Sequence, residues 1–241
     1  MGVPAVKEFI KVFYVNFGYP DNHFTRGILE QYLRCGAKAF LFDLPSFAPY
    51  LETDAIQKNM AYVLQHQGIK GVMAGISEFR SLHRDITISM IVYTDSIVKV
   101  GTGVFTQWCG ENGIRHVSLI SRERYGDMLS QMIQGGIIPT ISAEYSLDAA
   151  KQTGVRGDEL VTIQFGKKGT AYRESFAQRL QAVRAAVPGN PVWAEMGIST
   201  AEDVREIKAC GADGAIIGSA AMALWDDPTE LCAYLKTICE V

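Results

Sequence analysis

The sequence predicts an α/β fold, a single (β/α)8 barrel that occupies residues 1–241 as one domain. Short apolar runs alternate with amphipathic segments along the chain, which is the pattern of parallel strands that are each followed by a helix. No Ser/Pro-rich linker divides the chain, and 241 residues is close to the usual length of one such barrel. An open doubly wound sheet is the alternative. It would require a glycine fingerprint after the first strand, and residues 17–20 (FGYP) do not form one.

Eight runs have the composition of buried strands: residues 11–16, 37–44, 86–93, 116–120, 136–141, 159–164, 191–195 and 214–217. Helical spacing of apolar residues predicts helices over residues 22–35, 55–67, 76–83, 103–112, 123–134, 147–153, 172–187, 200–210, 219–224 and 228–238. Ser199, followed three residues later by Glu202, predicts a capping box at the start of the helix over residues 200–210. In such a barrel the chemistry is carried by the loops that follow the strands.

Charge and composition exclude several classes of protein. The formal net charge is −3 and no run of Lys or Arg exceeds two residues, which argues against nucleic-acid binding and against a polybasic membrane role. The apolar runs are shorter than the ~20 residues that span a bilayer, and residues 1–10 lack the features of a secretion signal, so we expect a cytoplasmic protein. The five cysteines form no CxxC pair and no histidine lies at metal-ligand spacing from them, which predicts reduced, structural cysteines and no bound metal.

Glycines occur at the ends of the sixth, seventh and eighth predicted strands, in the segments GKKGT (166–170), MGIS (196–199) and IGSA (217–220). Glycine lets backbone N–H groups approach an anion closely, and Ser219 opens a short helix whose N-terminus would point to the same place. The other interpretation is that these glycines only end the strands. Because three such segments converge at one end of the barrel, they predict a phosphate site, with Lys167 and Lys168 solvated or steering the anion.

Several short motifs occur in order along residues 11–224. They are NFGYPD at 16–21, GAKA at 36–39 followed by Pro45 and Pro49, IQ at 56–57, Tyr93, GIST at 197–200 and GADGAIIGSA at 211–220. Together they resemble the tryptophan synthase alpha subunit family. The last motif also occurs in other phosphate-binding barrels, whereas the N-terminal motifs favour this family. The resemblance implies that Gly169, Gly197, Gly218 and Ser219 bind phosphate and that Tyr93 lies in the active site.

The resemblance also implies an activity, the retro-aldol cleavage of indole-3-glycerol phosphate to indole and glyceraldehyde 3-phosphate, with no cofactor and with a β-type subunit as partner. The family uses a glutamate at the end of the second strand as acid/base and an aspartate in the following loop to engage the indole nitrogen. A gapless match places Leu41 and Glu52 at these two positions. Leucine cannot transfer a proton, so the standard acid is absent. Ser121 replaces an acidic residue that faces the β partner, and Met196 replaces a phenylalanine beside the indole.

Asp43 is the first candidate to replace the missing acid. It lies two residues beyond Leu41, so on a strand of period two it points to the same face, one layer nearer the barrel mouth. A carboxyl desolvated there would have a raised pKa suited to general acid/base work. The other interpretation is a loop cap or a salt-bridge partner of Lys38. Glu52 is the second candidate, with a solvated loop carboxylate as its alternative, and the phenol of Tyr93 could hydrogen-bond the substrate.

Two functional hypotheses follow. The first is a tryptophan synthase alpha-like lyase of amino-acid or secondary metabolism, which acts on indole-3-glycerol phosphate or an analogue with Asp43, Glu52 and Tyr93 as catalytic residues. The alternative is a non-catalytic phosphate-binding paralogue with a regulatory or scaffold role. Glu144 and Glu195 end the fifth and seventh predicted strands, and we expect them to be structural or to bind substrate hydroxyls rather than to catalyse.

Overall fold

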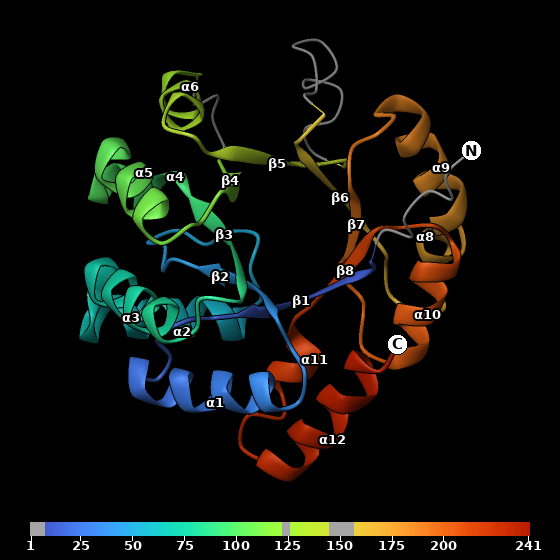
Figure 1. The fold of residues 1–241 in the computed structure, drawn as a ribbon, viewed down its shortest axis with the longest axis horizontal. Helices are drawn as coiled ribbons and strands as arrows, with labels where there is room; N and C mark the ends of the chain where they lie inside the picture. Colours follow the sequence, from blue (N-terminus) through green and yellow to red (C-terminus); the bar gives the residue numbers. More distant parts are fainter. Residues whose placement is uncertain (1–7, 122–125, 145–156) are drawn as a thin grey trace.

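The computed structural model describes residues 8–121, 126–144 and 157–241 (Figure 1). Eight parallel strands pair in chain order, and β8 also pairs with β1, so the sheet closes into a barrel. Helices surround the closed sheet (Figure 1). This arrangement confirms the predicted (β/α)8 barrel. Among the described residues, no helix is long and apolar enough to cross a membrane.

The strands are β1 (Ile10–Val15), β2 (Ala39–Asp43), β3 (Thr87–Tyr93), β4 (His116–Ile120), β5 (Ile138–Ser142), β6 (Leu160–Gln164), β7 (Val192–Glu195) and β8 (Gly214–Ile217). The helices are α1 (Asn22–Arg34), α2 (Asp54–His66), α3 (Gly68–Leu82), α4 (Thr94–Val100), α5 (Thr102–Glu111), α6 (Gly126–Gln134), α8 (Ala171–Glu174), α9 (Phe176–Ala186), α10 (Ala201–Ala209), α11 (Ser219–Met222) and α12 (Pro228–Cys239). Each predicted strand is present, within one or two residues of its expected ends. The helix predicted over residues 147–153 lies outside the described residues.

Helix α3 begins at Gly68 rather than at residue 76, where the sequence predicts its start. Glycines weaken the helical signal of this segment because glycine is a poor helix former. One of them is required by packing: a Cβ on Gly75 would lie 2.5 Å from the Asn22 side chain at the start of α1. Asn22 in turn donates to the Gly71 carbonyl at 2.8 Å, so the two helices touch closely at this point.

Other helix boundaries also differ from the prediction. Helix α4 follows β3 directly, where a loop is expected, and the helix expected over residues 172–187 is divided into α8 and α9. The capping box of α10 uses Thr200 and Asp203 instead of Ser199 and Glu202. Asp203 accepts the backbone N–H of Thr200 at 2.9 Å, whereas the Glu202 side chain pairs with Arg205 at the surface. The predicted cap is therefore displaced by one residue.

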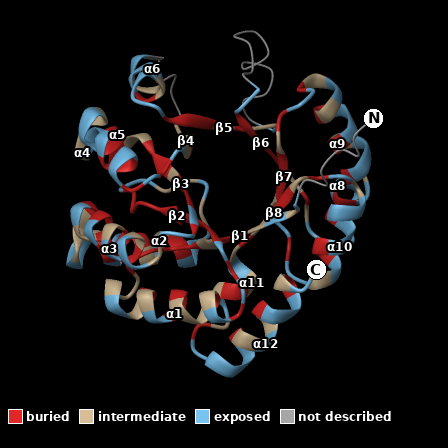
Figure 2. Ribbon diagram, in the orientation of Figure 1, coloured by how far each residue is buried: buried red, intermediate tan, exposed pale blue. Residues whose placement is uncertain are grey.

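Strand residues alternate between two separate cores. Outward-pointing residues such as Phe13, Phe40 and Phe42 pack against the helices in one large cluster. Inward-pointing residues form a small cluster inside the barrel: Val12, Ala39, Leu41, Leu160 and Trp193. Figure 2 shows buried residues along the strands and on the helix faces that turn towards them. Leu41 therefore serves as packing in the barrel interior, where it is 9% exposed.

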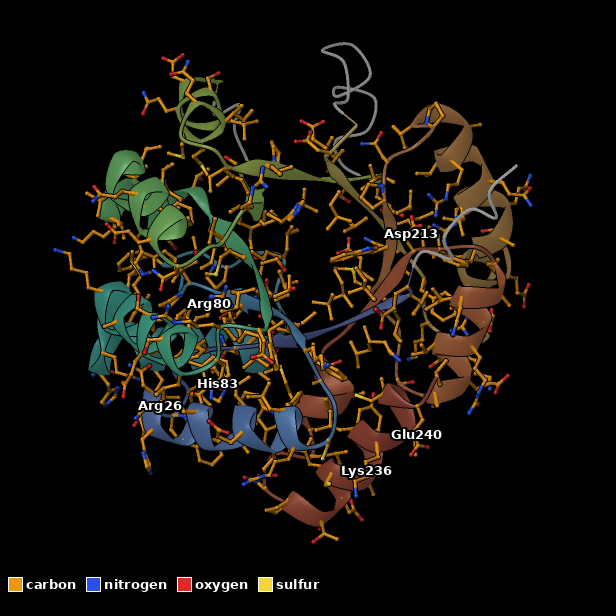
Figure 3. The ribbon with its side chains drawn as sticks, viewed as in Figure 1. Arg26, Arg80, His83, Asp213, Lys236 and Glu240 are labelled. Carbon is orange, nitrogen blue, oxygen red and sulfur yellow. The ribbon has the colours of Figure 1, made fainter. Side chains whose placement is uncertain are left out.

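Polar contacts reinforce the seam between α1 and α3. Arg26 of α1, Arg80 of α3 and His83, the residue after α3, are labelled in Figure 3. Arg26 forms an ion pair with Glu78. His83 Nε2 lies 2.7 Å from Glu30 Oε1, and Arg80 donates to the His83 carbonyl at 3.2 Å. The Arg26–Glu78 and His83–Glu30 contacts hold helix α1 against the C-terminal half of α3.

A second seam joins α1 to the C-terminal part of the chain. Trp225 Nε1 donates to the Tyr32 hydroxyl at 3.1 Å in the buried core. The Sγ atoms of Cys35 and Cys232 are 2.7 Å apart, although all five cysteines are free. Contacts between residues this far apart in the chain follow from barrel closure and could not be read from cysteine spacing.

We expect Gly214→Ala to lower the free energy of unfolding by about 1–3 kcal/mol, because overpacking a closed interior displaces its neighbours. A Cβ on Gly214 would lie 2.6 Å from the Ile10 carbonyl oxygen and 2.9 Å from the Trp193 ring. Gly27→Ala is the matched control, since a Cβ there meets nothing within 4 Å, and it should be neutral or stabilise helix α1 by up to about 1 kcal/mol. Urea denaturation measures both. Equal effects in the two variants would contradict this account of the closure.

Candidate active site

The carboxyl ends of the strands form one face of the barrel, and inward-pointing residues near these ends form its mouth. The inner cluster identifies which residues point inwards, because side chains alternate along a strand. Val12 and Leu41 are inward, so Tyr14, Asn16 and Asp43 follow on the same face towards the mouth. The structure thus bears out the predicted direction of Asp43.

Asp43 is held by three donors from β1 and the turn that follows it. Its Oδ2 accepts the Tyr14 hydroxyl and the Asn16 side-chain amide, both at 2.7 Å. Its Oδ1 accepts the backbone N–H of Phe17 at 3.1 Å. The carboxyl is only 1% exposed. It is therefore bound to strand β1 and not to Lys38, and its interior position rules out a loop cap.

Burial raises the pKa of Asp43 to about 7, because a buried carboxylate loses its hydration. The hydrogen bonds from Tyr14, Asn16 and Phe17 oppose this rise, and the nearby charge of Glu52 adds to it. Both protonation states are consequently populated near neutral pH. A group in this condition can accept and return a proton at low cost, which is the requirement for general acid/base catalysis.

Glu52 and Tyr93 form the second part of the mouth. The Tyr93 hydroxyl donates to Glu52 Oε1 at 3.1 Å and accepts the backbone N–H of Leu51 at 3.4 Å. The Tyr93 ring packs edge-on against Tyr50, with centroids 5.5 Å apart. Burial raises the pKa of Glu52, while the hydrogen bond from Tyr93 lowers it. Glu52 is thus a tethered, half-buried carboxyl close enough to influence Asp43, and not a solvated loop residue.

Tyr14 belongs to the same cluster and was not among the predicted site residues. Its hydroxyl contacts Asp43, and burial raises its pKa well above the ordinary value, so it remains protonated. Its ring lies against Gly218, where an added Cβ would be 3.3 Å from Tyr14 Cδ1. Tyr14 is half-buried, whereas Asp43 is fully enclosed. The period-two pattern of the first strand, which places residues 12, 14 and 16 on one face, is the signal that could have identified it.

The glycine segments after β6 and β7 are held together by their backbones. Gly166 N–H donates to the Met196 carbonyl at 3.1 Å. Gly197 has φ 83°, and a Cβ on it would lie only 2.4 Å from the Gly166 carbonyl oxygen, so no other residue fits this approach. Gly169 also has positive φ and lies in an exposed turn. The predicted phosphate residues therefore share the carboxyl end of the barrel on the adjacent strands β6, β7 and β8.

Beyond β8, Gly218 precedes the exposed Ser219, which opens α11. This helix has four residues, fewer than the six predicted over 219–224, so its dipole is small. Lys167 and Lys168 are both exposed, in keeping with either a solvated or a steering role.

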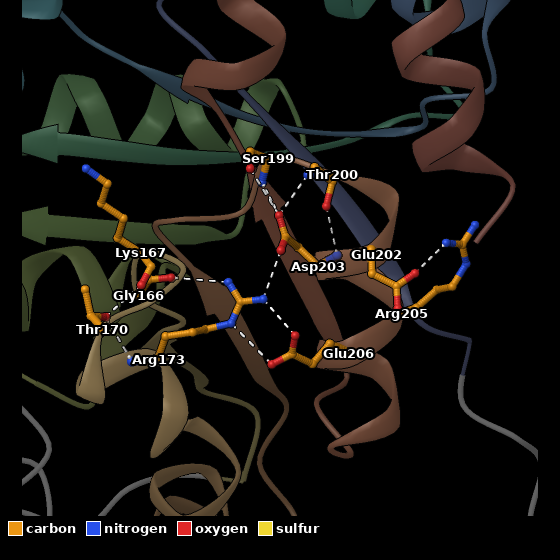
Figure 4. Close-up of polar contacts among 10 residues, drawn as sticks. All are labelled: Gly166, Lys167, Thr170, Arg173, Ser199, Thr200, Glu202, Asp203, Arg205 and Glu206. Atoms are coloured by element: carbon orange, nitrogen blue, oxygen red, sulfur yellow. Dashed lines mark hydrogen bonds and ion pairs between the residues drawn. The ribbon is translucent and has the colours of Figure 1, made fainter.

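An ion-pair network beneath the glycine loops was also missed by the sequence interpretation (Figure 4). Arg173 Nη2 lies 2.9 Å from Asp203 Oδ1 and 2.7 Å from Glu206 Oε2, and Nη1 donates to the Gly166 carbonyl at 3.4 Å. The guanidinium stacks on the Phe165 ring, 3.3 Å from its centroid. Arg173 thus ties the loop after β6 to helix α10. Its partners lie about thirty residues away in the chain, beyond the reach of any local motif.

Asp203 completes this network on the side of the β7 loop. Its Oδ2 accepts the backbone N–H groups of Ser199 at 2.8 Å and of Thr200 at 2.9 Å. Burial opposes ionisation of Asp203, but these bonds together with Arg173 lower its pKa below the ordinary value. The ionised carboxylate therefore fixes the two glycine loops relative to each other.

Glu195 and Glu144 lie at the ends of β7 and β5. Burial raises the pKa of Glu195 to about 7, with a hydrogen bond from Thr162 opposing and the charge of Glu144 adding to the rise. Glu144 accepts the Gln164 N–H at 2.9 Å and the Tyr172 hydroxyl at 2.8 Å, so it joins β5, β6 and α8. Among the described residues, no group of three or more His, Cys, Asp and Glu side chains could hold a metal ion.

Fold and site together define a (β/α)8 barrel with an acid–base cluster and glycine loops at its carboxyl face. Curated tryptophan synthase alpha chains are similar in sequence. The Synechocystis sp. protein is 27% identical over 243 residues, which cover 94% of this chain and 89% of that protein. The Corynebacterium diphtheriae protein is 27% identical over 217 residues, which cover 86% and 78%. No family model matches the chain.

Solved structures agree on the fold. Tryptophan synthase subunit alpha from Legionella pneumophila has a TM-score of 0.78 and 19% identity, covering 96% of this chain and 92% of that one. Tryptophan synthase from M. tuberculosis has a TM-score of 0.77 and 18% identity, covering 98% and 94%. The resemblance to the tryptophan synthase alpha subunit family is thereby confirmed over most of the chain.

Asp43→Asn is expected to change the pH dependence of stability. The native carboxyl has a pKa of about 7, above the ~4 of an unfolded chain, so wild-type stability falls as pH rises between these values. The free energy of unfolding of the variant relative to wild type should therefore rise by about 2–3 kcal/mol from about pH 5 to about pH 7. Urea denaturation at each pH measures it, with the exposed Asp85→Asn as control. A difference that does not vary with pH would refute the raised pKa.

Proposed function

We propose that the protein is a tryptophan synthase alpha-like lyase that cleaves or forms a carbon–carbon bond in a phosphorylated small molecule by retro-aldol chemistry. The observation that carries the proposal is the position of Asp43, a carboxyl with a pKa of about 7 that is hydrogen-bonded to Tyr14, whose ring lies beside the glycine loop at Gly218. A proton-transfer group is thus set next to the proposed phosphate site. Indole-3-glycerol phosphate, the substrate that the resemblance implies, or an analogue of it fits this chemistry.

Tyr14 and Asp43 act as one unit in the proposed mechanism. The half-buried Tyr14 hydroxyl accepts the proton of the substrate hydroxyl while its own proton passes to Asp43 Oδ2, 2.7 Å away. The hydroxyl carbon becomes a carbonyl, and the electron pair of the breaking carbon–carbon bond goes to the leaving carbon. Asp43 is enclosed, so it acts through Tyr14 and not by direct contact. The asymmetry in exposure between the two side chains supports this order of transfer.

Glu52 supplies the second proton. Burial raises its pKa, which favours the protonated form, and Tyr93 orients it by the 3.1 Å hydrogen bond. The protonated carboxyl gives its proton to the leaving carbon, and the proton held by Asp43 later restores Glu52 through solvent. Protons and electrons therefore balance without a cofactor. With indole-3-glycerol phosphate the products would be indole and glyceraldehyde 3-phosphate.

The backbone N–H groups around Gly169, Gly197, Gly218 and Ser219 are proposed to bind the phosphate, with the exposed Lys167 and Lys168 raising the local anion concentration. A β-type subunit is proposed as a partner by analogy with the relatives named tryptophan synthase. We place the protein in the cytoplasm on the same analogy and on the sequence features described above.

A non-catalytic phosphate-binding paralogue is the second candidate function. The observation in its favour is that Leu41, which the resemblance places at the position of the family's glutamate, packs in the apolar interior of the barrel. The two candidates agree on phosphate binding and differ on turnover.

Phosphate binding is tested by titration calorimetry with glycerol 3-phosphate. Ser219→Ala should weaken binding by about fivefold to tenfold, the usual effect of losing one hydrogen bond. Gly197→Ala should weaken it further, because the new Cβ would force the loops after β6 and β7 apart. The exposed Ser81→Ala on α3 should bind as wild type does. If the wild-type protein bound no phosphate compound, both candidate functions would fail.

Turnover is tested by release of glyceraldehyde 3-phosphate from a panel of phosphorylated aldol substrates that includes indole-3-glycerol phosphate, with and without a tryptophan synthase β subunit. Asp43→Asn should lower kcat by about 10²–10⁴-fold, and Glu52→Gln by a similar factor, as expected for loss of acid/base groups. Asp85→Asn is the matched control. Activity that survives both substitutions would exclude the proposed acid/base pair, and phosphate binding without any turnover would favour the non-catalytic paralogue.

A further inference from the structure

One wall of the barrel interior carries hydroxyl side chains. Strand pairing identifies them, because residues that lie opposite each other in neighbouring parallel strands point to the same side of the sheet. Thr140 is opposite Leu160, and Thr162 is opposite Trp193, both members of the inner apolar cluster. Ser118 is opposite Ile91, which packs against that cluster. Three consecutive strands, β4, β5 and β6, therefore each present a hydroxyl towards the barrel axis.

On β5, β6 and β7, the inward-pointing residue nearest the barrel mouth is also polar. Ser142 ends β5, Gln164 ends β6 and Glu195 ends β7. Ser142, Gln164 and Glu195 are half-exposed although they point inwards, as are Ser118 and Thr140. Solvent therefore reaches this wall. The Ser118 and Thr140 hydroxyls make no hydrogen bond to another group in the described part of the chain.

This wall faces the proton-transfer residues across the barrel. In a closed barrel of eight strands in chain order, β5 is opposite β1 and β6 is opposite β2. At equal height across the barrel, Ser142 on β5 faces Tyr14 on β1 and Gln164 on β6 faces Asp43 on β2. Thr140 and Thr162 lie one layer deeper, level with Val12 and Leu41. A ligand whose phosphate lies at the loops after β7 and β8 would extend its carbon chain between these two walls.

An aromatic ring in this space would remove water from the Ser118 and Thr140 hydroxyls without offering them a hydrogen-bond partner. Each polar group that loses water without gaining a partner weakens binding by about tenfold or more. Sites built to hydrogen-bond a substrate discriminate strongly against analogues that lack the matching groups. A chain of hydroxyl groups would instead pair with Ser118 and Thr140, and with Glu195, whose carboxyl can donate as well as accept when it is protonated.

We propose that the non-phosphate part of the substrate is a polyhydroxylated, sugar-type carbon chain and not an aromatic ring. This inference rests on the proposed function, since it assumes that a phosphate anchors the ligand at the glycine loops. It also agrees with the retro-aldol step, which needs a hydroxyl on the carbon that becomes the carbonyl.

The test compares the affinities of three probes by titration calorimetry: inorganic phosphate, ribitol 5-phosphate and indole-3-propanol phosphate. Ribitol 5-phosphate should bind at least about tenfold more tightly than either of the others. Replacing the hydroxyls in a Ser118→Ala/Thr140→Val double variant should remove most of that advantage and leave the affinity for inorganic phosphate unchanged. Thr87→Val is the matched control, because Thr87 also faces inwards, opposite Ala39, but is exposed at the other end of the barrel.

The outcomes separate this inference from the function on which it rests. Indole-3-propanol phosphate binding as tightly as ribitol 5-phosphate would overturn the inference and leave the phosphate-dependent lyase intact. An unchanged ribitol 5-phosphate affinity in the double variant would also overturn it. Failure of all three probes to bind would refute the phosphate site itself, and the inference with it. Circular dichroism and thermal denaturation of the double variant establish that it is folded, and Thr140→Val alone, nearly equal in volume, serves as the milder replacement.

Discussion

The pairing of β1 with both β2 and β8 is the interaction on which the rest of the structure depends. It closes the sheet, and closure brings together residues from the first fifth and the last tenth of the chain. Tyr14 of β1 thereby contacts Asp43 of β2 on one side and Gly218 after β8 on the other. The acid–base cluster and the proposed anion loop are adjacent only because a single strand lies between them.

Two aspartates show how the same chemical group is set to opposite states by its surroundings. Asp43 receives three hydrogen bonds but no cation, and desolvation prevails, so its pKa is raised. Asp203 is also buried, yet the Arg173 guanidinium and two backbone N–H groups outweigh desolvation and lower its pKa. The first arrangement leaves a proton that can move. The second leaves a permanent charge that holds loops in place.

The barrel interior is divided in the same way between packing and chemistry. Apolar residues, with Leu41 among them, fill its core and remove water there. Asp43 and Tyr14 lie at the mouth on one wall, and the hydroxyls of β4 to β6 begin one layer deeper on the other. Glycines at the rim let two loops approach closely, so that the Gly166 N–H donates to the Met196 carbonyl beside Gly197. The fold that carries these residues is similar to that of tryptophan synthase alpha chains.

The sequence by itself determined the barrel, its strands and the inward direction of Asp43, because these depend on periodicity and on short segments in which each residue's neighbours are known. It also located the glycine segments, and the resemblance placed Leu41 where the family has its glutamate. The sequence did not identify Tyr14 or Arg173 as site residues, because their roles depend on partners that are distant in the chain, Asp43 and Asp203. The capping box of α10 lies one residue later than predicted, because the side chain that bonds the N-cap backbone is Asp203 and not Glu202. Protonation states, the hydroxyl wall and the Tyr14–Asp43 contact were decided only by tertiary structure, since burial and cross-strand register do not exist until the barrel closes.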